Sequence, residues 1–138
     1  MKQGRDLKVG VERFPIRGGF TISRGAKHEA VVVVATISDG ASSGRGECVP
    51  YARYDESVEG VAQAIEACAP AVAGGLDQAG LQALLPPGAA RNALDCALWD
   101  LGAKISGRSA AERAGLAPLR AVETAFTISL ASPEEMAA

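Results

Sequence analysis

Aromatic residues are scarce in this sequence: Phe, Trp and Tyr together make up 4% of its 138 residues, with a single tryptophan. There is also only one histidine. The core must therefore be built mainly from Ala, Val, Leu and Ile, and 48% of the residues are hydrophobic. With 22% charged residues, the composition is that of an ordinary globular domain. The lone His28 has no partner motif, so we expect it to be structural. The length is that of about one domain.

The sequence also lacks an excess or a cluster of positive charge. It contains 14 Lys and Arg against 16 Asp and Glu, for a formal net charge of −2. Nucleic acid is therefore not expected as a partner. No apolar run is long enough to span a bilayer, so a membrane partner is not expected either. The N-terminus has no apolar segment typical of a signal peptide. We expect a cytoplasmic protein.

Cysteines are few and dispersed, at Cys48, Cys68 and Cys96. An odd number without Cys-x-x-Cys spacing argues against a disulfide framework and against a zinc site. We expect all three to be small buried hydrophobic residues in a reducing compartment.

The first third of the chain contains three strand patterns. Residues 7–12 alternate between apolar and polar, which predicts a half-buried strand. Residues 30–37 are a β-branched run that predicts a central strand, and residues 45–49 predict the returning strand. Residues 14–25 are glycine-rich and irregular, so we interpret them as a long loop. These patterns predict a three-stranded antiparallel sheet.

Helical patterns follow the sheet, which places the chain in the α+β class. Asp55 or Ser57 caps a predicted helix over 58–69 that Pro70 kinks or ends. Asp77 opens a short helix to Leu85. A later short helix begins at the Ser109–Glu112 capping box. Between these two short helices, the segment 90–104 has apolar residues at helical spacing: Ala90, Leu94, Ala97, Leu98, Leu101 and Ile105.

The apolar residues of the segment 90–104 form one broad stripe along a helix, and Gly107 is expected to end that helix. So many alanines allow another backbone to approach closely, so we expect this helix to lie between two layers. Trp99 flanks the stripe and should be largely buried. Arg91–Asp95 and Asp100–Lys104 read as ordinary surface ion pairs at i,i+4 spacing.

The last twenty residues change character. Residues 121–130 predict a strand, and Ser132-Pro133-Glu134-Glu135 is a full helix-start signal. A strand followed by a helix start resembles the first unit of a βα repeat, which cannot bury both of its faces alone. We expect a fragment with one domain over 1–118 and the start of a second over 119–138. The alternative is a frayed tail after an edge strand.

Three stretches carry a family resemblance. Residues 90–100, Ala-Arg-Asn-Ala-x-Asp-x-Ala-x-Trp-Asp, resemble the signature of the amino-terminal domain of the enolase superfamily, in its mandelate racemase/muconate-lactonising branch. Residues 46–54, Gly-Glu-Cys-x-Pro-Tyr-x-Arg-Tyr, and residues 124–136 resemble most the L-Ala-D/L-Glu (dipeptide) epimerase group.

The resemblance implies a capping α+β domain that ends in the first βα unit of a truncated (β/α)₇β barrel. It further implies epimerisation of a dipeptide through an enediolate, with two lysines as acid and base and with Mg²⁺ as cofactor. In the family, the lysines and the metal ligands lie on later barrel strands that this sequence does not contain. We therefore expect no catalytic and no metal-binding residue here, an inactive fragment, and the protein's own C-terminal barrel as partner. A homo-oligomer is left open.

What the resemblance does place in this chain is substrate specificity. It matches residues 14–25 and 50–57 to two loops that close over the barrel mouth. The expected substrate-binding residues are Arg24, Phe20, Ile22, Tyr54 and Thr127, with Tyr51 as a weaker candidate. An arginine suits the carboxylate of a glutamate-containing dipeptide, because its planar fork binds carboxylate bidentately. The alternative is that Arg17 and Arg24 are solvated charges and Phe20 plugs the sheet.

Other functions remain open at this point. The same lid could serve o-succinylbenzoate synthase or a muconate cycloisomerase-like enzyme of the same superfamily. A third alternative is a non-catalytic α+β binding module.

Overall fold

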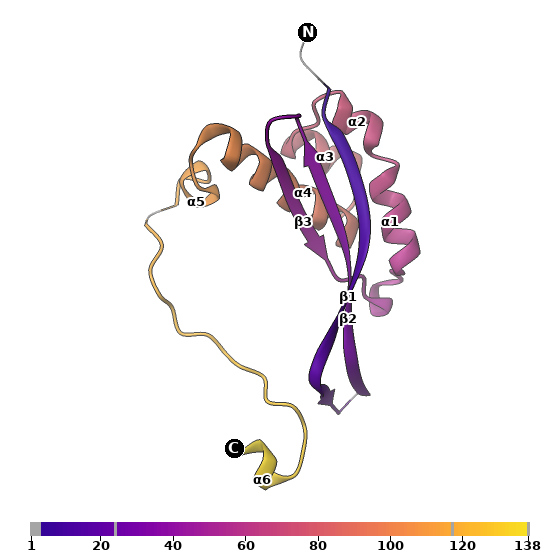
Figure 1. Ribbon diagram of the computed structural model, residues 1–138, viewed down its shortest axis with the longest axis vertical. Coiled ribbons are helices and arrows are strands. Elements are labelled where there is room, and N and C mark those ends of the chain that lie inside the picture. The colour runs from indigo at the N-terminus through magenta and orange to yellow at the C-terminus, as the bar shows by residue number, and fades with distance from the viewer. Residues whose placement is uncertain (1–3, 24, 117, 138) are drawn as a thin grey trace.

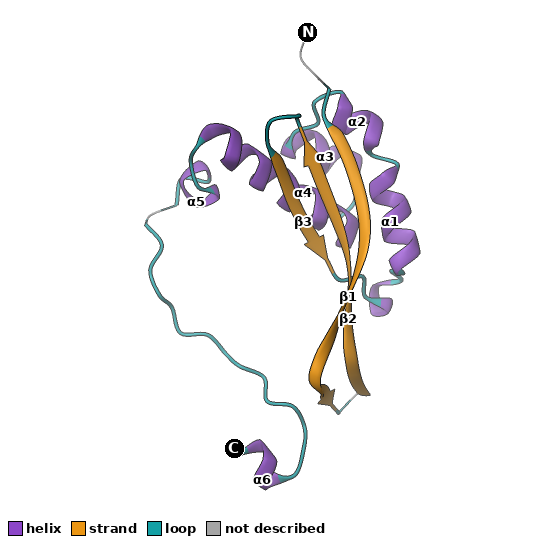
Figure 2. Cartoon of the chain, viewed as in Figure 1, coloured by secondary structure: helices purple, strands orange, loops and turns teal. Residues whose placement is uncertain are grey.

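A three-stranded antiparallel sheet packs against a layer of helices in the computed structural model, which describes residues 4–23, 25–116 and 118–137 (Figures 1 and 2). The strands are β1 (Asp6–Ile22), β2 (Gly25–Ser38) and β3 (Ser43–Cys48), in the order β1-β2-β3. The helices are η1 (Ala52–Tyr54), α1 (Val58–Glu66), α2 (Ala69–Ala73), α3 (Gln78–Leu84), α4 (Ala89–Ser106), α5 (Ala110–Arg113) and α6 (Pro133–Met136). The predicted α+β class and the sheet are confirmed.

The predicted loop over 14–25 is wrong, because β1 continues to Ile22 and pairs again with β2. The register runs from Asp6↔Ser38 to Pro15↔Glu29 and resumes at Phe20↔Lys27. Residues 16–19 thus stand opposite His28 alone, and Gly18 and Gly19 have φ of 73° and 74°. Such a bulge breaks the alternation that a strand normally shows in sequence. The resulting hairpin extends beyond the helices (Figure 1).

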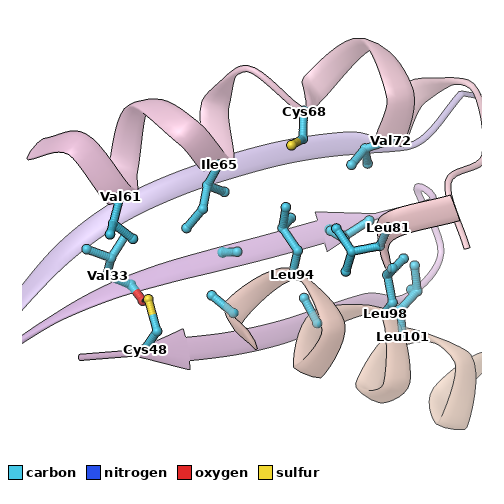
Figure 3. Packing of buried hydrophobic residues seen from close by; sticks show 14 residues of the cluster. Val33, Cys48, Val61, Ile65, Cys68, Val72, Leu81, Leu94, Leu98 and Leu101 are labelled. Carbon is cyan, nitrogen blue, oxygen red and sulfur yellow. The ribbon is translucent and has the colours of Figure 1, made fainter. Parts of the chain in front are cut away.

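The core lies between the sheet and the helices. Val33, Ala35 and Ile37 alternate along β2 and are 0% exposed. Their partners from the helices include Ile65, Val72, Leu81, Leu94 and Leu101 (Figure 3). Burying each large aliphatic side chain stabilises the fold by about 1.5–3 kcal/mol. Cys48 and Cys68 are buried as expected, but Cys96 is exposed on the outer face of α4, so the expectation was wrong for this residue.

The expected close approach of the alanine-rich helix is confirmed where α4 crosses β3. Gly44 and Gly46 are buried on the face of β3 that meets α4. A Cβ on Gly46 would collide with the carbonyl oxygen of Ala93, and one on Gly44 with that of Ala97. The two elements therefore pack backbone to backbone, which only glycine permits at these positions.

Hydrogen bonds also stabilise the packing of α4 against β3. A carboxylate oxygen of Asp100 accepts hydrogen bonds from the amide of Arg45 at 2.8 Å and from Nζ of Lys104 at 2.7 Å. Lys104 also donates to the carbonyl oxygen of Ser43 at 2.9 Å. The predicted Asp100–Lys104 pair therefore exists, and it also ties the helix to the strand. Arg91–Asp95 is not among the ion pairs of the described residues, and Arg91 donates to the carbonyl oxygen of Leu85 instead.

The helix ends follow their sequence signals. Ser57 and Asp77 cap α1 and α3 by accepting hydrogen bonds from the amides of Gly60 and Gly80. Pro70 lies in the first turn of α2, so the predicted kink is a break between two helices. Trp99 is half-buried, not largely buried as expected. Its ring faces the Arg113 guanidinium of α5, 5.6 Å from the ring centroid, and does not lie in the core cluster.

The segment after α5 differs from its prediction. Residues 118–129 are extended but have no strand assignment, so the predicted strand over 121–130 is not formed. A strand needs a neighbour for its backbone hydrogen bonds. Within the described part of the chain, the segment meets the hairpin through Ser129 and Leu130, which hydrogen-bond to the backbone of Thr21 at 2.9 and 2.8 Å. The helix start at Ser132 is confirmed as a capping box with Glu135.

None of the helices in the described ranges combines the length and the apolar character that crossing a membrane requires.

Candidate functional site

The end of the β1–β2 hairpin and the segment that follows β3 come together at one hollow. The hollow has a volume of about 340 Å³ and is lined by Phe20, Ile22, Gly25, Ala26, Lys27 and Tyr51. Phe20 and Lys27 are paired across the two strands of the hairpin. The two segments expected to act together, 14–25 and 50–57, therefore meet, although the first is a hairpin and not a loop.

Lys27 gives this hollow its positive charge. Its Nζ lies 5.5 Å from the centre of the Tyr51 ring, within the range of a cation–π contact. Among the ion pairs of the described residues, none involves Lys27. Apolar walls with one converging polar group are typical of a small-molecule site. An ammonium group at such walls is suited to a small ligand that carries a carboxylate.

The structure brings only some of the expected site residues together at the hollow. Phe20 and Ile22 line the hollow, and so does the weaker candidate Tyr51. Tyr54 lies next to Tyr51, with ring centroids 5.9 Å apart, but is 72% exposed and lines a neighbouring hollow with Glu56. Thr127 is exposed and is not part of the lining. Arg24 lies outside the described residues.

Sequence reasoning missed Lys27 and Glu56 as site residues. Lys27 stands in a polar stretch without apolar periodicity, so nothing local marks it; its role depends on the contact with Tyr51. Glu56 is half-buried and accepts hydrogen bonds from the amides of Tyr51 and Ala89. These two amides are 38 positions apart, so no local motif reports the contact.

The Cys48 thiol lies at the neighbouring hollow, which Tyr51 and Tyr54 also line. Burial raises the pKa of the Cys48 thiol to about 11, so this thiol is neutral at pH 7. Within the described ranges, no three side chains of His, Cys, Asp or Glu gather as metal ligands. What this arrangement can do chemically is bind, orient and cover a ligand.

Taken together, the fold and the hollow define a class: an α+β domain with a hollow at the end of a long hairpin. The family model described as "Mandelate racemase / muconate lactonizing enzyme, N-terminal domain" matches residues 5–115. The chain belongs to this family.

Known proteins similar to the chain are longer than it is. The L-Ala-D/L-Glu epimerase of Escherichia coli (strain K12) is 44% identical over 133 residues, covering 96% of this chain and 41% of that protein. The N-acetyl-D-glutamate racemase of a Pseudoalteromonas species is 41% identical over 107 residues, covering 76% and 34%. The chain therefore spans about two fifths or less of the length of these relatives.

A solved structure extends the similarity to the fold in detail. It is the crystal structure of an enolase family member from Agrobacterium tumefaciens with homology to dipeptide epimerases, with bound sodium and L-Ala-L-Glu and an ordered loop. It is 56% identical to this chain with a TM-score of 0.91, and the match covers 96% of this chain and 41% of that one.

Proposed function

We propose that this chain is the substrate-recognition domain of a dipeptide epimerase that inverts the α-carbon of a glutamate-containing dipeptide such as L-Ala-L-Glu. The observation that carries the proposal is the hollow, which joins the two segments expected to set specificity. The similarity to the E. coli epimerase over 96% of the chain supports the reaction class. The rest of the protein supplies the barrel.

In this proposal, the residues of the chain bind and enclose the substrate. Phe20 and Ile22 cover the apolar part of the dipeptide and exclude water from it. Lys27 and Arg24 provide positive charge for the glutamate side-chain carboxylate, Arg24 from its place in the sequence alone. Tyr51 supports Lys27 through its ring. Tyr54 and Thr127 remain proposed substrate contacts.

The acid/base lysines and Mg²⁺ belong to the barrel in this proposal. The described residues bring together no ligand set for a metal. When bound there, the ion stabilises negative charge on the substrate carboxylate as its α-proton leaves. Residues 1–138 alone are accordingly proposed to be inactive. The cytoplasmic location and a homo-oligomeric state remain predictions.

The test is proton exchange at the α-carbon in the full-length protein. L-Ala-L-Glu is incubated with the protein and Mg²⁺ in D₂O, and proton NMR follows the glutamate α-proton. The proposal expects loss of this signal together with the appearance of L-Ala-D-Glu. Absence of both, with the protein folded and Mg²⁺ present, would refute the dipeptide assignment.

A second candidate is racemisation of N-acetylglutamate. It is favoured by the similarity to the Pseudoalteromonas racemase over 107 residues. Both candidates place a glutamate carboxylate in the hollow, so the same lining serves either. The ratio of kcat/KM for L-Ala-L-Glu and for N-acetyl-D-glutamate decides between them: the dipeptide proposal requires the first value to be the larger.

A further inference from the structure

We propose that Glu56 is a positioning residue: it holds Tyr51 at the hollow and so tunes substrate binding without touching the substrate. The inference rests on the proposed function for what binds there. The contacts of Glu56 itself come from the structure.

The Glu56 carboxylate joins two parts of the fold with its two oxygens. Oε2 accepts a hydrogen bond from the amide of Tyr51 at 3.1 Å, and Oε1 accepts one from the amide of Ala89 at 2.7 Å. Ala89 is the first residue of α4, an 18-residue helix whose N-cap, Gly88, has no side chain to accept from it. Glu56 therefore supplies the acceptor that the N-cap lacks, at the end of the helix where negative charge is favourable.

The segment that carries Tyr51 has little else to fix it. The short helix η1 that follows Tyr51 contains no buried residue, and Tyr51 makes no side-chain capping bond to it. The chain reverses at Asp55, which has a φ of 57°. This reversal brings Glu56 back to the Tyr51 amide. A segment with so few buried contacts opens easily unless a specific bond holds it.

Tyr51 transmits this support to the hollow. Tyr51 lines the hollow, and Nζ of Lys27 lies 5.5 Å from the centre of its ring. A displacement of the Tyr51 backbone therefore moves one wall and withdraws the partner of the cation. The line of contacts runs from α4 through Glu56 and Tyr51 to Lys27, so a rigid core helix fixes the position of a surface site.

A double-mutant cycle in the full-length enzyme separates this role from simple helix capping. Glu56→Ala, Tyr51→Ala and the double variant are compared for KM, kcat and melting temperature. Glu56→Ala should raise the KM for L-Ala-L-Glu by roughly tenfold, the size of one lost charged hydrogen bond, and change kcat by less than about threefold. In the Tyr51→Ala background, the same substitution should leave KM unchanged. Melting temperature should fall in both backgrounds, because both lose the α4 cap.

Two further variants sharpen the comparison. Glu56→Gln keeps the shape but offers an NH₂ group to one of the two amides, so its KM should lie between those of wild type and Glu56→Ala. Glu59→Ala is the matched control: Glu59 is an exposed carboxylate in the first turn of α1, and its KM should equal the wild-type value. An unchanged KM in Glu56→Ala, or an equal rise in both Tyr51 backgrounds, would overturn the inference.

A second measurement does not depend on any substrate. Amide hydrogen exchange by NMR should show faster exchange at Tyr51 and Ala89 in Glu56→Ala than in wild type, and no change in Glu59→Ala. If wild type turns over no dipeptide, the proposed function fails, and exchange at Tyr51 still decides whether Glu56 positions this segment. Unchanged exchange at Tyr51 overturns the inference whatever the substrate.

Discussion

At the scale of single residues, Lys27 supplies the positive charge of the hollow, and its ammonium group lies over the Tyr51 ring. We predict that Lys27→Met lowers kcat/KM for L-Ala-L-Glu by about tenfold in the full-length enzyme, since a charged hydrogen bond contributes about 1.5–3 kcal/mol and exposure weakens it. For L-Ala-L-Gln the loss should be small, because the amide carries no charge. Steady-state kinetics with both dipeptides measures the difference.

Three variants serve as comparisons for Lys27→Met. Lys8→Met removes an exposed lysine on β1 that does not line the hollow, so kcat/KM should stay unchanged for both dipeptides. If the bidentate guanidinium of Arg24 is the main partner of the carboxylate, Arg24→Ala should lower kcat/KM for L-Ala-L-Glu more than Lys27→Met does. Arg24→Lys should recover only part of that loss. If Lys27→Met lowers kcat/KM equally for the two dipeptides, Lys27 affects the shape of the hairpin and does not recognise the charge of the substrate.

Asp100 offers a prediction about pH. Its hydrogen bond from Lys104, and then that from the Arg45 amide, lower the pKa of the folded carboxyl below the ordinary value of 3.8. A lowered folded pKa means that the carboxylate stabilises the fold above pH 3.8 and that this contribution is lost as pH falls through the lower folded pKa. Asp100→Asn should therefore destabilise the chain at pH 7, by on the order of 1 kcal/mol after solvent screening.

Urea unfolding of wild type and Asp100→Asn, at pH 7 and near pH 2.5, tests this sign. The gap in unfolding free energy should be present at pH 7 and should shrink in acid, where the wild-type carboxyl also becomes protonated. A gap of the same size at both pH values would show that the side chain acts through shape alone.

At the scale of helices and strands, the sequence predicted the features that depend on interactions between residues close together in the chain. The caps at Ser57, Asp77 and Ser132 formed as predicted because each hydrogen bond spans three residues. The central strand was predicted because β-branched residues favour strands. The longer β1 was missed, since a bulge at Gly18 and Gly19 hides the strand period. The sequence predicted Phe20, Ile22 and Tyr51 but missed Lys27, because Lys27 meets Tyr51 only in the folded chain.

The contact between α4 and β3 gives a prediction of its own. Gly46→Ala should destabilise the chain by about 3 kcal/mol, the upper range for overpacking, because the new Cβ meets the Ala93 carbonyl and neither backbone can yield without moving its element. Gly10→Ala is the matched control: on β1, a Cβ at Gly10 meets nothing within 4 Å, so its effect should be neutral or slightly stabilising. Equal effects of both substitutions on urea unfolding would contradict the close packing.

At the scale of the whole molecule, the segment after α5 stands apart from the core. All buried hydrophobic residues among those described lie between Val32 and Leu101. In contrast, Leu119, Val122 and Phe126 are 78%, 81% and 89% exposed. Apolar side chains on an extended segment need a partner to cover them, and the proposed barrel is such a partner. The boundary at residue 118 stays a prediction, and the contrast between a buried core before it and exposed apolar side chains after it supports that prediction.

We predict from this that a variant ending at Pro118 keeps the stability of the 138-residue chain to within about 0.5 kcal/mol, as expected for a change away from the core. The slope of unfolding free energy against urea should also be nearly unchanged, because it follows the surface that unfolding exposes and the removed segment is already exposed. The hydrogen bonds of Ser129 and Leu130 to Thr21 are what the variant loses. Ser129→Ala in the longer chain isolates the side-chain bond and should have an effect below about 0.5 kcal/mol. A loss above about 2 kcal/mol in the shortened variant would mean that residues 119–137 belong to the first cooperative unit, and the boundary at 118 would be wrong.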